Sequence, residues 1–209
     1  MSQPDRLPRF TPAERFAHRG VAVLGVVLTI TGLILYVPEL SVLVARRRTV
    51  EGIHLGAGLL LPLPVFAALL SPAFRADLAR LNRFGPADWV WLRGRTRRTA
   101  ALAVGKFNAG QKLAAAAFAA AGVVLLGTGV MLAVPDRLRL SDGLRQGATI
   151  THDATTLALV ALLVGHVTLA YRHPEARRAL RIGTMDAEYA EQHHSDWAGR
   201  AGDTTERSA

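Results

Sequence analysis

The chain contains no cysteine among its 209 residues. This absence excludes structural disulfides, cysteine-ligated zinc sites, iron–sulfur clusters and covalently attached c-type haem, all of which need thiol side chains. Acidic residues are also few, because 16 Asp and Glu stand against 25 Lys and Arg, for a formal net charge of +9. Half of the residues are apolar, so apolar and charged residues must be segregated along the chain. Apolar blocks with basic flanks are typical of an integral membrane protein.

Four stretches lack Lys, Arg, Asp and Glu for long enough to cross a bilayer, which takes about 20 helical residues. They run from Gly20 to Val37, Ile53 to Leu70, Leu113 to Val134 and Ala154 to Tyr171. Because backbone polar groups in lipid must be bonded internally, each stretch is expected to be a helix. The sequence thus predicts an all-α integral membrane domain over residues 1–198, a four-helix bundle with spans at about 16–38, 51–71, 106–134 and 147–172. Residues 199–209 are expected to form a polar tail.

The distribution of basic residues predicts the orientation of the four spans. The side that holds both termini receives 19 Lys and Arg, and the opposite side receives 6. By the positive-inside rule, both termini are expected to be cytoplasmic. The basic segment 73–105 lies on the same side, where we expect it at the membrane interface. Basic flanks of membrane spans also account for the high charge, so the sequence predicts membrane lipid and no nucleic acid as a partner.

Four of the seven histidines lie in or at the ends of the predicted spans, namely His18, His54, His152 and His166. The topology sorts them into two pairs of matching depth, His54 with His152 toward the outer face and His18 with His166 toward the cytoplasmic face. His152 and His166 are about 21 Å apart along one helix and about 40° short of four full turns, so both lie on one face. Imidazole is a good axial ligand of haem iron, and bundles place cofactors between facing helices. We therefore predict two b haems, each held by two histidines.

Other interpretations of these histidines remain open. A single histidine in a helix bundle is more often a hydrogen-bonded structural residue than a ligand. A histidine-lined metal transporter belongs to a different class, although the four uncharged stretches contain no Asp or Glu to receive a hard or borderline cation at the membrane midplane. A cofactor-free membrane anchor leaves four ionisable residues at membrane depth unexplained.

Several motifs resemble the gamma subunit of membrane-bound respiratory formate dehydrogenase, a four-helix cytochrome b. That family is related more distantly to the cytochrome b subunits of nickel–iron hydrogenases. The motifs are Gly105-Lys106-Phe107-Asn108-Ala109-Gly110-Gln111-Lys112, Arg15-Phe16-Ala17-His18, Gly165-His166, His173-Pro174 and Ala190-Glu191-Gln192-His193-His194-Ser195-Asp196-Trp197. The resemblance extends from Arg9 to about Trp197, and the chain has Tyr189 where the family often has Trp.

The resemblance implies a division of labour within a formate dehydrogenase complex. A catalytic (alpha) subunit oxidises formate, an iron–sulfur (beta) subunit relays the electrons, and this chain is the non-catalytic electron-transfer subunit. Electrons pass from the haem of His54 and His152 to the haem of His18 and His166 and then to a quinone, menaquinone or ubiquinone. The location implied is the bacterial cytoplasmic (inner) membrane, in anaerobic respiration. The alternative is the cytochrome b subunit of a hydrogenase or of another periplasmic oxidoreductase.

The motif that opens the third span resembles the quinone-site segment of that family. Asn108 and Gln111 are the implied hydrogen-bonding partners of a quinone oxygen, and Gly110 lets the quinone ring approach the backbone. A structural interpretation of the same residues makes Asn108 the N-cap of the helix and Gln111 a polar residue of its first turn. Lys106 and Lys112 either neutralise haem propionates or anchor the helix at the interface. His173, His193 and His194 lie beyond the fourth span, where they either serve a proton route to a reduced quinone or are solvated interfacial residues, and the sequence assigns them no role between these.

Overall fold

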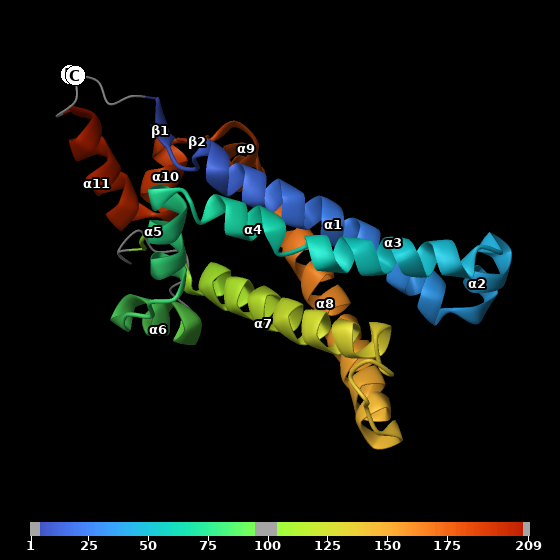
Figure 1. Cartoon of the computed structure of the whole chain (residues 1–209). Coiled ribbons are helices and arrows are strands. Elements are labelled where there is room, and N and C mark those ends of the chain that lie inside the picture. Colours follow the sequence, from blue (N-terminus) through green and yellow to red (C-terminus); the bar gives the residue numbers. More distant parts are fainter. Residues whose placement is uncertain (1–4, 95–103, 207–209) are drawn as a thin grey trace. The chain divides into compact units, whose positions relative to one another are not determined.

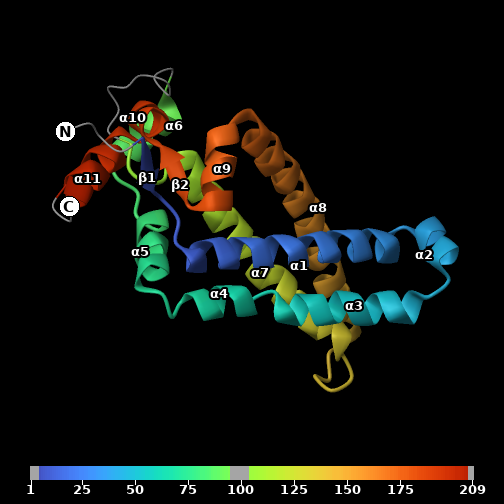
Figure 2. The same ribbon diagram turned by 90° about the horizontal axis from the view of Figure 1, so that it is seen from above.

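The computed structural model describes residues 5–94 and 104–206, with side chains as far as residue 201. Within these ranges the chain is almost entirely helical, which confirms the predicted all-α fold (Figures 1 and 2). Four segments there are long and apolar enough to cross a membrane, and they are Pro12–Tyr36, Arg47–Ala68, Ala109–Ala133 and Asp142–Arg172. Each corresponds to one of the four predicted spans.

The ends of the spanning helices have local causes. Helix α1 (Pro12–Tyr36) starts with a proline, whose missing N–H is not needed in a first turn, and it ends just before Pro38. The short α2 (Pro38–Val44) follows it. Helix α7 (Ala109–Ala133) begins directly after the Asn108 position. Helix α8 (Asp142–Arg172) starts earlier than the predicted span, since the Ser141 hydroxyl accepts a hydrogen bond from the Leu144 N–H.

The second span differs from the single helix that we expected. It consists of α3 (Arg47–Leu60) and α4 (Leu63–Ala68), separated by a turn at residues 61 and 62. Pro62 and Pro64 cause the break, because each lacks an N–H and its ring clashes with a carbonyl of the preceding turn. At its other end the helix starts at Arg47, which pairs with Glu51 one turn later at 2.9 Å. His54 therefore lies two turns inside α3 rather than at its start.

Contacts between residues divide the chain into two compact units. The first compact unit comprises Met1–Arg15, Leu70–Ala117 and Gly165–Ala209, and the second comprises Phe16–Leu69 and Phe118–Val164. Within the second unit α1 lies alongside α3 (Figures 1 and 2).

The first compact unit contains a small two-stranded sheet that the sequence did not predict. Strand β1 (Arg6–Pro8) pairs antiparallel with β2 (Thr184–Asp186), and Leu7 lies opposite Met185. Both side chains are almost fully buried and join a core with Ala179, Ala190 and Ala198. Helices α9 (Pro174–Ile182), α10 (Ala187–His193) and α11 (Ser195–Glu206) supply this core. Residues 199–206 of the expected polar tail are thus the later turns of α11.

The turn that leads from α9 into β2 needs a glycine. Gly183 has φ of 95°, in the left-handed region that side chains disfavour. A Cβ atom there would also lie 2.8 Å from the Phe10 carbonyl oxygen. The Gly183 carbonyl accepts hydrogen bonds from the N–H groups of Arg9 and Phe10 at 2.8 and 2.9 Å. This turn therefore fixes the start of the chain beside β2.

The described residues of the predicted interfacial segment 73–105 contain two short helices. These are α5 (Pro72–Leu81) and α6 (Pro86–Arg93), and both belong to the first compact unit. The Ser71 hydroxyl caps α5 by accepting a hydrogen bond from the Phe74 N–H. Residues 95–103 of this segment lie outside the described residues.

Candidate functional site

His54 lies half-buried on α3, and a threonine on the facing helix α1 orients its ring. The Nδ1 atom of His54 is 2.8 Å from the hydroxyl oxygen of Thr31. That hydroxyl lies 2.7 Å from the Val27 carbonyl oxygen, so its one hydrogen is donated to this carbonyl. The Thr31 oxygen must then accept the hydrogen bond from His54 Nδ1–H. This network assigns the tautomer whose Nε2 carries the free lone pair.

His152 on α8 repeats this arrangement with α7. Its Nδ1 atom is 2.8 Å from the hydroxyl oxygen of Thr128. The Thr128 hydroxyl donates to the Val124 carbonyl oxygen at 2.7 Å. His152 therefore also donates from Nδ1 and keeps Nε2 as an acceptor.

A glycine follows each of these threonines and lies against the histidine ring. A Cβ atom on Gly32 would be 3.4 Å from Cε1 of His54, and one on Gly129 would be 3.5 Å from Cε1 of His152. Each imidazole thus packs directly on the backbone of the facing helix.

The two imidazoles lie next to each other within the second compact unit. Their ring centroids are 6.4 Å apart and their planes make an angle of 66°. Two imidazoles on opposite sides of one iron, each bonded at roughly 2 Å as in nitrogen-ligated metal sites, have centroids about 6 Å apart. The spacing, the tautomers and the glycine-lined contacts all fit a haem held by His54 and His152.

The other predicted pair is divided between the two compact units. His18 lies on α1 in the second unit, and His166 lies on α8 in the first unit. Both are exposed. A haem between them therefore stays a prediction from the sequence.

Asn108 and Gln111 form the N-terminal cap of α7. The side-chain oxygen of Asn108 accepts from the Gln111 N–H at 2.9 Å, and that of Gln111 accepts from the Asn108 N–H at 3.0 Å. This reciprocal pair is a capping box, which satisfies two N–H groups of the first turn. The structural interpretation of both residues is therefore realised. The box uses the oxygen of each carboxamide and leaves the nitrogen as a donor.

The indole ring of Trp91 occupies the space beside the Gly110 backbone. A Cβ atom on Gly110 would lie 2.8 Å from Cη2 of Trp91 on α6. Beside this contact, Trp91, Asp88, Asn108 and neighbouring residues line a cavity of about 20 Å³. That volume holds about one water molecule. A quinone ring would need Trp91 to move.

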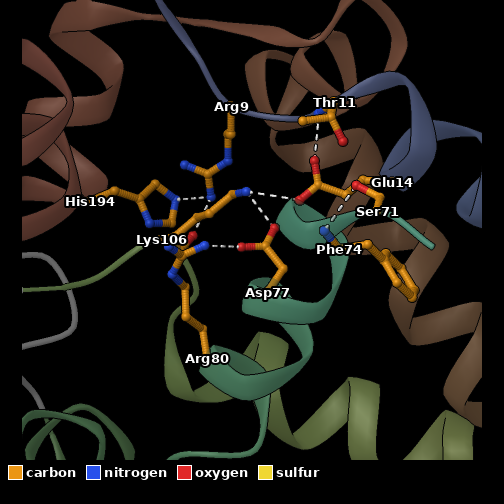
Figure 3. Close-up of polar contacts among 9 residues, drawn as sticks. All are labelled: Arg9, Thr11, Glu14, Ser71, Phe74, Asp77, Arg80, Lys106 and His194. Atoms are coloured by element: carbon orange, nitrogen blue, oxygen red, sulfur yellow. Dashed lines mark hydrogen bonds and ion pairs between the residues drawn. The ribbon is translucent and has the colours of Figure 1, made fainter. Parts of the chain in front are cut away.

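Lys106 lies between two buried carboxylates in the first compact unit (Figure 3). Its ammonium group is 3.1 Å from the Glu14 carboxylate and also pairs with Asp77. All three side chains are less than 10% exposed, and the more exposed Arg80 binds Asp77 at 2.5 Å. Burial, together with the neighbouring Glu14, raises the pKa of Asp77 to about 6. Lys106 is thus committed to two carboxylates of its own chain.

Lys112 has a similar internal role at the start of α7. Its ammonium group binds the Asp88 carboxylate at 2.7 Å and the Arg83 carbonyl oxygen at 2.8 Å. The two lysines of the third-span motif therefore connect α7 and the residues before it to α5 and α6.

His194, for which the sequence indicated no role, is a buried neutral residue. Its Nδ1–H donates to the Gly105 carbonyl oxygen at 2.9 Å, and Nε2 accepts from the Arg9 guanidinium at 3.1 Å (Figure 3). Arg9 is itself only 4% exposed and donates to the Lys106 carbonyl at 2.5 Å. Burial, followed by the charge of Arg9, lowers the pKa of His194 to about 3. This network joins the chain start, the α7 motif and α10.

His173 and His193 flank Tyr189. His173 Nδ1 is 3.2 Å from the Tyr189 hydroxyl, and the His193 ring stacks on Tyr189 with centroids 4.0 Å apart. Both histidines are exposed.

Reasoning from the sequence missed Thr31 and Thr128. A signal for them exists, because the dipeptide Thr-Gly occurs in two spans, 23 residues before His54 and 24 residues before His152. Reasoning from the sequence also missed the contacts of Arg9 with Lys106 and His194, for which the local sequence carries no comparable signal.

Comparison with known protein families matches residues 9–185 to a family model described as prokaryotic cytochrome b561. The matched range contains all four spans, the four span histidines and the third-span motif. No curated protein matches the chain.

Proposed function

The chain belongs to the prokaryotic cytochrome b561 family, and from that membership, together with the resemblance of its third-span motif and tail to formate dehydrogenase gamma subunits, we propose that it is the electron-transfer subunit of a formate dehydrogenase complex. Membership makes it a multi-pass membrane cytochrome that takes part in electron transport and binds b-type haem. We place it in the bacterial cytoplasmic membrane with both termini cytoplasmic, because its basic residues are concentrated on that side.

The observation that carries the proposal is the pair of imidazoles 6.4 Å apart. His54 and His152 would hold the iron through their Nε2 atoms, since each Nδ1 is already bonded to a threonine hydroxyl. A bound haem supplies reversible one-electron chemistry at its iron. The residues supply two neutral ligands with fixed ring orientations.

A second b haem is proposed between His18 and His166. The support is the sequence, in which both residues fall at the cytoplasmic ends of their spans and His166 shares a helix face with His152. Two haems at the two depths complete a route for electrons across the bilayer. By the topology expected from the sequence, this pair lies at the same ends of the spans as the Asn108 motif that precedes α7.

The electron acceptor is proposed to be a quinone, menaquinone or ubiquinone, near the start of α7. The carboxamide nitrogens of Asn108 and Gln111 remain as donors after the capping box is formed. Gly110 supplies the close approach to the backbone once the Trp91 indole moves aside. The resemblance of residues 105–112 to the quinone-site segment of formate dehydrogenase gamma subunits supports this assignment.

The proposed partners are the iron–sulfur (beta) and catalytic (alpha) subunits of formate dehydrogenase. The motif Asn108-Ala109-Gly110-Gln111 and the tail around His193 favour this donor. A hydrogenase, or another periplasmic oxidoreductase, is the alternative donor, and the family match is compatible with either. The family match favours a cytochrome over a metal transporter or a cofactor-free anchor.

The test is the haem content of the purified full-length chain, measured from pyridine haemochrome and reduced-minus-oxidised spectra. We expect about two b haems per chain, about one in His54→Ala and about one in His166→Ala. His173→Ala is the matched control, because His173 is an exposed histidine outside the ligand set, and it should keep both. A folded chain without haem would overturn the cytochrome assignment. Reduction of the haems in membranes by formate, but not by hydrogen, would identify the donor.

A further inference from the structure

Thr31 holds His54 and Thr128 holds His152 in the same way, each through its hydroxyl oxygen. We propose that Thr31 and Thr128 are positioning residues, which select the tautomer of the haem ligands and set the reduction potential of the haem between them. The inference rests on the proposed ligation by His54 and His152.

The direction of the hydrogen bonds follows from the contacts of each hydroxyl. The Thr31 oxygen is 2.7 Å from the Val27 carbonyl and 3.3 Å from the Leu28 carbonyl, so the helix backbone takes its hydrogen. The third neighbour, His54 Nδ1 at 2.8 Å, must then be a donor. A hydroxyl has one hydrogen and two lone pairs, so it accepts here while it donates to its own helix.

The same distances recur around Thr128 on α7 and His152 on α8. Thr128 lies 2.7 Å from the Val124 carbonyl, 3.3 Å from the Leu125 carbonyl and 2.8 Å from His152 Nδ1. The two threonines are on different helices, and each is followed by a glycine that leaves the imidazole against the backbone. A hydroxyl that merely back-bonds to its own helix has no reason to meet a histidine nitrogen at both places.

A hydroxyl acceptor has a definite effect on a ligand. A hydrogen-bond acceptor on the nitrogen that does not bind the metal raises the basicity of a ligating imidazole, and a carboxylate does so most strongly because it is charged. A charged side chain at this depth would also be costly in the bilayer. A hydroxyl gives each imidazole a moderate increase in basicity, which stabilises oxidised iron to a moderate extent. Removing the acceptor should therefore raise the reduction potential.

The experiment is a redox titration of the haem absorbance of the full-length chain in detergent or nanodiscs. Thr31→Val and Thr128→Val keep the shape of the side chain and remove the hydroxyl acceptor, while the backbone carbonyls of Leu28 and Leu125 beside the two histidines remain. We expect each to raise the midpoint potential of the haem that His54→Ala abolishes, and the double variant to raise it further. Thr31→Ser, which keeps the hydroxyl, should restore the wild-type value.

Thr29→Val is the matched control. Thr29 is on the same helix, and its hydroxyl also back-bonds to a carbonyl, that of Gly25 at 2.8 Å. We expect it to leave the potential unchanged. Electron paramagnetic resonance of the oxidised haem should change for Thr31→Val and not for Thr29→Val, because only the former alters a ligand.

The outcomes separate this inference from the proposed function. If His54→Ala keeps its full haem content, the ligation is wrong. If His54→Ala loses one haem but both valine variants titrate like the wild type, the ligation stands and the threonine role is overturned. If a valine variant loses its haem, recovery with serine supports the role, and loss with serine as well overturns it.

Discussion

The indole of Trp91 packs against the backbone of Gly110, where a Cβ atom would be 2.8 Å from Cη2. We predict that Gly110→Ala destabilises the protein by about 1–3 kcal/mol, the usual cost of overpacking. Chemical unfolding in detergent measures the change. Replacing Trp91 by the smaller Leu in the same chain should recover part of the loss, so that the two changes are not additive. A fully additive double variant would contradict the contact.

A second prediction separates the cap of α7 from quinone binding. Gln111→Ala removes the acceptor for the Asn108 N–H and should cost about 1 kcal/mol of stability. Gln111→Glu keeps that acceptor, so its stability should stay near the wild-type value. Glutamate lacks the amide donor, however, so quinone reduction by the complex should fall in this variant. Unchanged quinone reduction in Gln111→Glu would remove Gln111 from the quinone site.

A third prediction concerns the ammonium group between Glu14 and Asp77. Lys106→Met leaves two buried carboxylates without their shared cation, and breaking such a buried pair typically costs about 3–5 kcal/mol. Unfolding of the full-length chain in detergent measures the loss. Lys106→Met combined with Asp77→Asn should be more stable than Lys106→Met alone, because one of the two buried negative charges is gone. Equal stability of these two variants would speak against the ion-pair cluster.

The buried neutral His194 predicts a pH dependence. Its pKa is lowered to about 3 in the folded chain from an ordinary value of 6.5, so between these values the unfolded chain binds the proton and the folded chain does not. Its contribution to stability is therefore complete above pH 6.5 and is lost as the pH falls toward 3. The loss should reach about 2 kcal/mol at pH 5, at about 1.4 kcal/mol per pH unit.

Unfolding measured between pH 5 and 8 tests this dependence. His194→Asn should flatten the acid side of the profile, whereas His193→Asn, at the exposed neighbour, should keep it. A wild-type profile as flat as that of His194→Asn would show that His194 is not held neutral.

The spanning helices and the histidines on them could be predicted from the sequence because lipid allows so few alternatives. A stretch without charge must be a helix, and a histidine inside it stands out. Pro62 and Pro64 were missed as a helix break because the apolar run continues through them. The break depends on the missing N–H groups and not on hydropathy.

The partners of these histidines could not be predicted in the same way. Whether Thr31 meets His54 depends on how α1 and α3 are rotated about their axes, which an apolar sequence leaves nearly free. Arg9 and His194 are 185 residues apart in sequence, and neither has a local pattern that indicates the other. Asn108 and Gln111 did carry a local pattern, and the capping interpretation of that pattern is the one realised in the structure.

The positions of His54 and His152 have a topological consequence. They lie roughly a hundred residues apart in a chain that has no cysteine to cross-link it. Under the proposed ligation, one iron connects the helix pair α1 and α3 to the helix pair α7 and α8. It thereby closes the loop of chain between His54 and His152. In the unfolded chain such a closure costs about 4 kcal/mol of entropy. The cofactor then cross-links the two helix pairs, and folding of the membrane domain becomes coupled to the supply of haem.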